Sequence, residues 1–119
     1  MIRFLIVGWL LLQSSLLPAE DRALKAFYQE RCAVCHGTEG TGRGSGGVRL
    51  GGRNLTDSRW MVKQAEADLT ATILRGRGAM PGFRRQLGEA EVKRLLAEVI
   101  RPLSGRRSKV SMPVEESAR

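Results

Sequence analysis

The pentapeptide from Cys32 to His36 places two thiols and an imidazole within little more than one helical turn. Thiols three positions apart on a helix lie on one face, and each can add to one vinyl group of a porphyrin. The adjacent imidazole then lies beneath the iron as its first axial ligand. The C-x-x-C-H spacing therefore predicts one covalent haem c, attached through Cys32 and Cys35, with His36 on the metal.

Other uses of this pentapeptide fit the chain less well. A structural zinc site needs four protein ligands, whereas the chain holds two cysteines and one histidine. A thioredoxin-like C-x-x-C accompanies a βαβ pattern, and no strand-rich run lies near this one. A disulfide between Cys32 and Cys35 stays open in an oxidising compartment, but it would leave His36 without a role.

The second axial ligand must come from another part of the chain. With one histidine present, the candidates are methionine, lysine, water or an open position. Met80 is flanked by Gly78 and Pro81, which hold it on a turn, whereas Met61 lies in a predicted helical segment where a thioether more often packs in the core. We expect Met80 to bind the iron, with Met61 or an open site as alternatives. His/Met ligation raises the reduction potential and leaves no free coordination position, so we expect electron transfer and no catalysis.

Helices joined by glycine-rich loops must position these ligands. A first helix over 22–35, behind Asp21 as N-cap, would place Leu24, Tyr28 and both cysteines on one stripe. Residues 37–52 hold too many glycines for a regular element and predict a loop over one haem edge.

Three further helical segments follow this loop. We expect a short one through Trp60 and Met61 capped by Thr56 or Asp57, one over 66–75 closed by Gly76, and a last one over 89–101 that starts at a weak Gly88 cap and stops near Pro102. The sequence thus predicts an all-α fold of about four short helices wrapped around one covalently bound haem.

The 119 residues divide into three segments. Residues 1–19 predict a secretory signal with a basic Arg3, an apolar core and a small-residue cleavage site, and its apolar run is shorter than the ~20 residues that span a bilayer. Residues 20–104 form the cofactor domain, and residues 105–119 are polar and aperiodic, which predicts a disordered tail. We therefore expect a periplasmic protein with no transmembrane anchor after cleavage.

The charge of the chain suggests the kind of partner it meets. The net charge is +8, and it stays strongly positive without Arg3 because 19 Lys and Arg then face 12 Asp and Glu. Outside the cytoplasm nucleic acid is an improbable partner, so we expect redox proteins with an acidic docking face. A solvated basic surface without a specific partner is the alternative.

The motifs together resemble those of class I cytochromes c, over about 23–103. C-x-x-C-H-G (Cys32 to Gly37) and the later Met80-Pro81 pair carry the resemblance. The stretch Arg53 to Trp60 is similar to the N-L-T-D…W segment of cytochrome c domains in bacterial terminal-oxidase subunits. This similarity implies that Asn54 and Trp60 contact a haem propionate or edge, although Trp60 could simply fill the core. Arg53 replaces the usual proline, which puts its guanidinium near a propionate or in solvent.

The resemblance implies a one-electron carrier between redox enzymes, and we expect a monomer or a subunit of a redox complex. One alternative is a permanent haem subunit of a larger dehydrogenase or oxidase complex. Another is catalysis at an open iron site, which requires that Met80 not bind the metal.

Overall fold

The computed structural model describes residues 19–110, and within this range the chain is helical with two isolated β-bridges and no strand. The helical elements are α1 (Ala19–Phe27), the π-helical turn η1 (Tyr28–Cys32), α2 (Ala33–His36), the 3-10 turn η2 (Ser45–Gly47), α3 (Ser58–Met61), α4 (Glu66–Arg75), α5 (Glu89–Leu95), the π-helical turn η3 (Leu96–Ile100) and α6 (Arg101–Val110). The expected all-α class is confirmed. The predicted signal segment lies outside the described residues except for Ala19, which begins α1.

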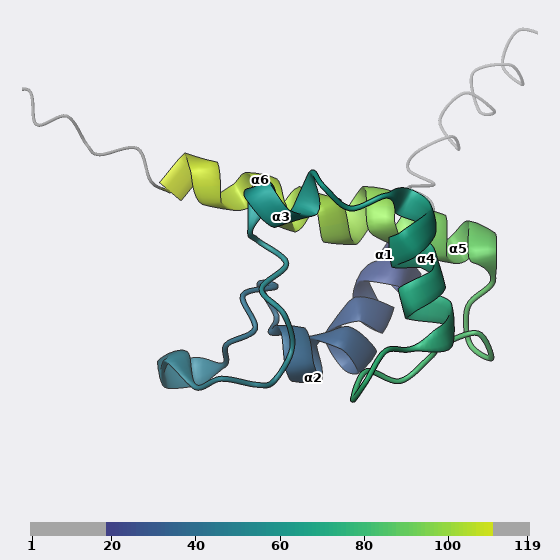
Figure 1. The fold of residues 1–119 in the computed structure, drawn as a ribbon, viewed down its shortest axis with the longest axis horizontal. Coiled ribbons are helices and arrows are strands. Elements are labelled where there is room, and N and C mark those ends of the chain that lie inside the picture. The colour runs from purple at the N-terminus through teal and green to yellow at the C-terminus, as the bar shows by residue number, and fades with distance from the viewer. Residues whose placement is uncertain (1–18, 111–119) are drawn as a thin grey trace, which may run out of the picture.

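Two long helical rods organise the fold. The N-terminal rod consists of α1, η1 and α2, and the C-terminal rod consists of α5, η3 and α6. The two rods pack where α1 meets α5 and η3, while α4 packs on α5 and α3 packs on α6. Figure 1 shows the C-terminal rod across the upper part of the molecule, with α2 and two long loops on the opposite side, one between α2 and α3 and one between α4 and α5. The rods therefore leave one side of the molecule to the loops.

The N-terminal rod is longer than the predicted helix and contains a change of phase. The Ala33 amide donates to the Tyr28 carbonyl, five residues back, so η1 holds one residue more than an α-helical turn. Leu24 and Tyr28 are buried as predicted, but Cys32 is half-buried and Cys35 is exposed. The inserted residue lies between Tyr28 and both cysteines, so it interrupts the regular spacing on which the predicted stripe rests, and only the part from Leu24 to Tyr28 is confirmed.

The predicted end of the last helix near Pro102 is wrong, because the C-terminal rod continues to Val110. Proline in a helix removes one amide donor and crowds the preceding turn. The wide turn η3 comes directly before it, with the Arg101 amide donating to the Leu96 carbonyl. Beyond the proline, Leu103 is buried against the backbone of Gly40, which gives the helix a reason to continue.

The C-terminal rod includes the first part of the segment that was expected to be a disordered tail. Residues 105–110 of the predicted tail are helical as part of α6. The remaining residues of that tail, 111–119, lie outside the described part of the chain.

The two short helices predicted for the middle of the chain are confirmed, and so is the start of the last helix after Gly88. Asp57 caps α3 by accepting a 3.2 Å hydrogen bond from the Trp60 amide, and α4 covers the predicted residues and ends at Gly76. Gly88 precedes α5, and its amide donates to the Glu91 carboxylate at 2.8 Å, which compensates for the missing cap side chain. These elements surround one apolar core, whose buried members are Leu24, Tyr28, Ala33, Leu55, Met61, Ile73, Phe83, Leu87, Val92, Leu95, Leu96, Ile100 and Leu103.

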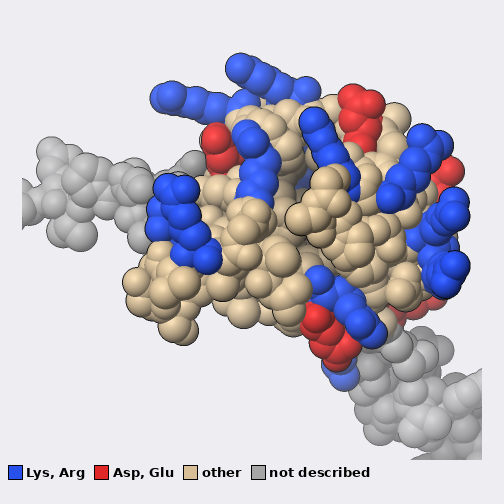
Figure 2. Space-filling view, turned by 60° about the horizontal axis from the view of Figure 1, so that its bottom comes forward, with Lys and Arg blue, Asp and Glu red and all other residues tan. Residues whose placement is uncertain are grey.

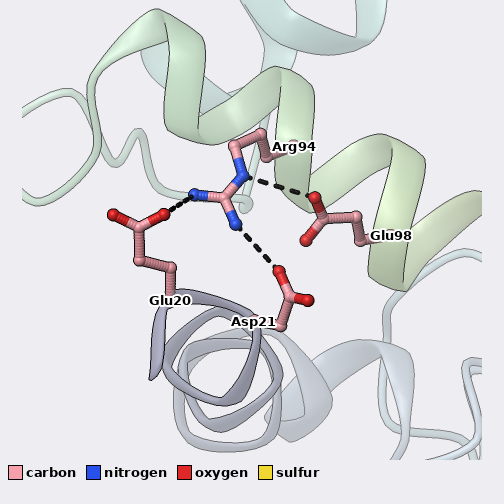
Figure 3. Close-up of polar contacts among 4 residues, drawn as sticks. All are labelled: Glu20, Asp21, Arg94 and Glu98. Atoms are coloured by element: carbon pink, nitrogen blue, oxygen red, sulfur yellow. Dashed lines mark hydrogen bonds and ion pairs between the residues drawn. The ribbon is translucent and has the colours of Figure 1, made fainter. Parts of the chain in front are cut away.

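One arginine joins the two rods at their exposed edge (Figure 3). Arg94 of α5 donates to Glu20 and Asp21 of α1, both at 2.8 Å, and to Glu98 one turn further along its own rod at 3.3 Å. Asp21 was expected to cap the first helix. It lies inside α1 instead, where its carboxylate binds the guanidinium.

Candidate haem-attachment site

The C-x-x-C-H motif ends the N-terminal rod, and loop amides take up its last carbonyl groups. The Gly37 amide donates to Ala33 at 2.8 Å, Gly52 donates to Cys35 at 2.9 Å, and Gly42 donates to His36 at 2.6 Å. The last carbonyls of a helix have no partner within the helix and need such donors. The predicted 37–52 loop is therefore confirmed as a loop, and its contacts show that it holds the motif in place.

Glycine is required where this loop lies against the motif. A Cβ at Gly52 would collide with the Cys35 carbonyl and the His36 amide nitrogen. A Cβ at Gly37 would come within 2.7 Å of the Arg43 carbonyl oxygen, and its φ of +81° disfavours other residues as well. The loop thus approaches the backbone of the motif as closely as glycine permits.

The His36 ring is oriented by one hydrogen bond. Its Nδ1 lies 2.9 Å from the carbonyl oxygen of Arg53, seventeen residues later. A carbonyl oxygen only accepts hydrogen bonds, so Nδ1 carries the proton and Nε2 keeps its lone pair. An imidazole held in this tautomer can bind a metal through Nε2, and a carbonyl partner on the other nitrogen makes it a stronger ligand.

Tyr28 anchors the same motif from inside the core. Its hydroxyl donates a 2.8 Å hydrogen bond to the carbonyl of Gly37, and the side chain is only 1 % exposed. Burial, with a smaller contribution from Cys32, raises the pKa of Tyr28 to about 12. Sequence reasoning placed Tyr28 on the buried stripe but missed this bond. The signal was available, because a buried tyrosine normally has a partner for its hydroxyl.

The two cysteines are free thiols in different surroundings. Cys32 is half-buried, and burial raises the pKa of its thiol to about 11, whereas Cys35 is exposed. In the described part of the chain, neither cysteine is joined in a disulfide. Two thiols and an imidazole that can bind a metal through Nε2 form a donor set that fits a covalent haem.

Met80 lies on a tight turn, as predicted. Its amide and carbonyl both pair with Arg77, each at 3.0 Å, and a Cβ at Gly76 would collide with the Met80 carbonyl. The Met80 side chain is half-buried against the core, whereas Met61 is 2 % exposed inside it. Met61 thus has the core position expected for it, and iron ligation by Met80 stays a prediction.

The segment after the glycine loop is held by three side chains. Asn54 accepts hydrogen bonds from the amide and the hydroxyl of Thr56, at 2.9 and 2.6 Å, so its carbonyl group stabilises a local turn. The Arg53 guanidinium carbon lies 4.1 Å from the centre of the Trp60 ring, and Trp60 is half-buried against the core. The contact between Arg53 and Trp60 was not predicted, because nothing in the spacing of these residues along the chain indicates it.

Comparison with known proteins identifies the family. The family described as cytochrome c oxidase, cbb3-type, subunit III matches residues 19–97, which include the whole motif and the Met80 turn. The chain belongs to this family. Its class I cytochrome c character is thereby confirmed, and its cofactor is covalently bound haem c.

The relatives that this chain matches are longer proteins. The cbb3-type cytochrome c oxidase subunit CcoP of Azospirillum brasilense is 36% identical over 76 residues, which cover 63% of this chain and 26% of that protein. The CcoP subunit of Rhodobacter capsulatus is 35% identical over 105 residues, which cover 79% of this chain and 34% of that protein. The chain therefore spans about a quarter to a third of the length of these relatives.

A solved structure agrees with the family. The c-type cytochrome KustC0563 superimposes with a TM-score of 0.55 and 30% sequence identity, over 66% of this chain and 94% of that one. In the part of the cytochrome domain that the structure describes, no helix is long and apolar enough to cross a membrane.

Proposed function

We propose that this chain is an exported haem c domain that passes single electrons as a permanent subunit of a redox complex. Its family relatives are named as oxidase subunits, which supports the subunit alternative over a freely diffusing carrier. Residues 1–19 would direct its export to the periplasm. The observation that carries the proposal is the His36 ring, which follows Cys35 directly in the chain and which the Arg53 carbonyl holds through Nδ1.

Each ligand has a defined task in this proposal. Cys32 and Cys35 would hold the porphyrin through covalent bonds, and His36 and Met80 would bind its iron. The bound haem supplies an iron that changes valence by one electron. The hydrogen bonds that hold His36 and the Met80 turn would keep both side chains in place when the iron changes valence, so little rearrangement would accompany transfer.

Intact mass under denaturing conditions tests the attachment. We expect the mature chain plus one haem, and we expect Cys32→Ala with Cys35→Ala to give the polypeptide mass alone. Haem that acid extracts from the wild-type protein would contradict the two covalent bonds.

Optical spectra test the second ligand. Met80→Ala should abolish the weak far-red sulfur-to-iron band, lower the reduction potential and admit carbon monoxide readily. Met61→Ala is the matched control and should leave the band intact. The assignment is wrong if Met61→Ala removes the band and Met80→Ala does not, and rapid carbon monoxide binding by the wild type would favour the catalytic alternative.

The size of the native assembly distinguishes a subunit from a carrier. After gentle detergent extraction of membranes, we expect the haem-stained chain to migrate with a complex much larger than 13.1 kDa. Recovery of all the haem-stained chain as a free monomer from the soluble fraction would favour the carrier.

Arginines around the two long loops support docking to an acidic partner. No Asp or Glu occurs in residues 40–56 or 69–88. Figure 1 shows both loops on the side of α2, and Figure 2, turned toward that side, shows basic side chains around a mostly uncharged surface. The exposed arginines of the two stretches are Arg43, Arg49, Arg53, Arg75, Arg77, Arg84 and Arg85.

Electron transfer at different salt concentrations tests this docking surface. The rate with an acidic redox protein should fall as salt rises, because the Debye length shrinks to ~8 Å at 0.15 M. Arg77→Glu with Arg84→Glu should weaken the dependence, and Lys25→Glu on α1 is the control. A salt-independent rate would favour a solvated surface without a specific partner.

A further inference from the structure

We propose that Arg53 is a positioning residue, whose side chain, stacked on Trp60, holds its own carbonyl oxygen against the His36 imidazole. The inference rests on the proposed function, since it takes His36 to be the iron ligand. It adds to that function a residue that controls the orientation and strength of the ligand.

Arg53 makes two contacts that together join the ligand to α3. Its carbonyl oxygen lies 2.9 Å from Nδ1 of His36, and its guanidinium carbon lies 4.1 Å from the centre of the Trp60 ring. Trp60 in turn belongs to α3, which Asp57 caps at 3.2 Å, and its ring packs partly against the core. The carbonyl is thus connected through its own side chain to a fixed element of the fold.

Within the described residues, no backbone amide donates to the Arg53 carbonyl, so no hydrogen bond from the main chain fixes it directly. Gly51, with a φ of +98°, and Gly52 directly precede Arg53, and glycines allow the chain the widest range of conformations. The nearest backbone anchors are the Gly52 amide on Cys35 and the Leu55 amide on the Gly40 carbonyl, at 2.9 and 2.6 Å. The peptide group after Arg53 lies between them, and the stacked side chain restrains the residue that carries the His36 partner.

Arg53 can act by positioning its carbonyl or by the positive charge of its guanidinium. Loss of the first role raises the reduction potential, and loss of the second lowers it. A hydrogen bond from Nδ1 makes the imidazole a stronger donor, which favours ferric iron, so a weaker bond raises the potential. A cation near the site favours ferrous iron, so removal of its charge lowers the potential. Trp60→Leu removes the stacking partner and keeps the arginine charge. Positioning therefore predicts a higher potential in this variant, whereas a purely electrostatic Arg53 predicts no increase.

The rate of hydrogen exchange at Nδ1 of His36 measures directly how well its hydrogen bond to the Arg53 carbonyl is held. The chain contains one histidine, so ¹⁵N-histidine labelling of the ferrous holoprotein gives one Nδ1–H signal. We expect Trp60→Leu and Arg53→Gln to speed its exchange about two- to fivefold, as the loss of an exposed cation–π contact predicts. Trp60→Phe and Arg53→Lys retain an aromatic ring and a cation, so they should recover most of the protection.

Controls separate this inference from general destabilisation and from the proposed function. Arg59→Gln, at an exposed arginine beside Trp60 in the chain, should leave both the exchange rate and the potential unchanged. Arg53→Gln keeps the core intact should Trp60→Leu fail to fold. Wild-type exchange in Arg53→Gln with His36 bound to iron would overturn the inference and leave the proposed function standing. If the His36 signal of the wild-type holoprotein shows no bond to iron, both the inference and the proposed function are wrong.

Discussion

The two helical rods and the loop over the haem-attachment motif are held in place by different groups. The rods pack through buried apolar side chains, with Leu24 and Tyr28 on one and Val92, Leu95 and Leu96 on the other. The loop packs through main-chain amides of glycines, which bind the last carbonyls of α2.

This difference teaches where the molecule tolerates change. Apolar side chains of similar volume can replace one another in a core at modest cost. A main chain in contact with another main chain has no side chain to exchange, so even one added methyl group displaces it. Four substitutions, taken from the largest expected effect to the smallest, test this contrast.

Removal of the Met61 side chain should cost the most. Met61→Ala leaves a cavity in the core, and we expect the free energy of unfolding to fall by about 2–5 kcal/mol. Val62→Ala, at a neighbouring residue that is 76% exposed, should change it by less than ~0.5 kcal/mol. Urea unfolding of the holoprotein measures both. Equal effects of the two variants would show that the haem and not this core dominates stability.

Addition of one methyl group at Gly52 should act on the site itself. Gly52→Ala forces the loop away from Cys35 and should lower the free energy of unfolding by about 1–3 kcal/mol. Gly105→Ala is the matched control, since nothing lies within 4 Å of its Cβ and α6 should gain about 0.5–1 kcal/mol. Thermal unfolding compares them, and a neutral Gly52→Ala would show that the loop yields easily.

Tyr28 belongs to both regions and gives a pH-dependent test. Tyr28→Phe leaves the Gly37 carbonyl without its hydrogen bond and should cost about 1 kcal/mol at neutral pH. The folded pKa of about 12 lies above the ordinary value of 10.0, so the neutral phenol favours the folded state. Its contribution is complete below pH 10 and is lost as the pH rises toward 12.

Unfolding measured from pH 8 to pH 12 isolates this contribution. The stability difference between wild type and Tyr28→Phe should shrink across the upper part of that range. A constant difference up to pH 12 would mean that the hydroxyl does not sense its burial.

The ion pairs between the rods should have the smallest effect. Arg94→Gln removes three partners at once, but the guanidinium and all three carboxylates are more than a third exposed to solvent, which weakens such pairs. We expect a slight decrease in melting temperature that disappears at high salt, and Arg94→Lys should recover part of it. A large, salt-independent decrease would show that Arg94 is essential to the rod contact.

Much of the site was predictable because its chemistry is local. The spacing of Cys32, Cys35 and His36 allows one cofactor class, and the glycine and proline around Met80 specify a turn. Helix α4 likewise follows from its own apolar spacing and the glycine that ends it. These features depend on neighbours in the chain, which a sequence displays directly.

The sequence by itself determined the cofactor, the helical class and the ends of the short helices, because each depends on residues a few positions apart. Only the tertiary structure decided which carbonyl orients His36, what Arg53 contacts, and how far the last helix extends. The carbonyl of Arg53 is seventeen residues from His36, and the reason for α6 to pass Pro102 is the packing of Leu103 on Gly40. Such contacts arise from long-range packing, whose free energy overrides the local preference of a proline or a glycine.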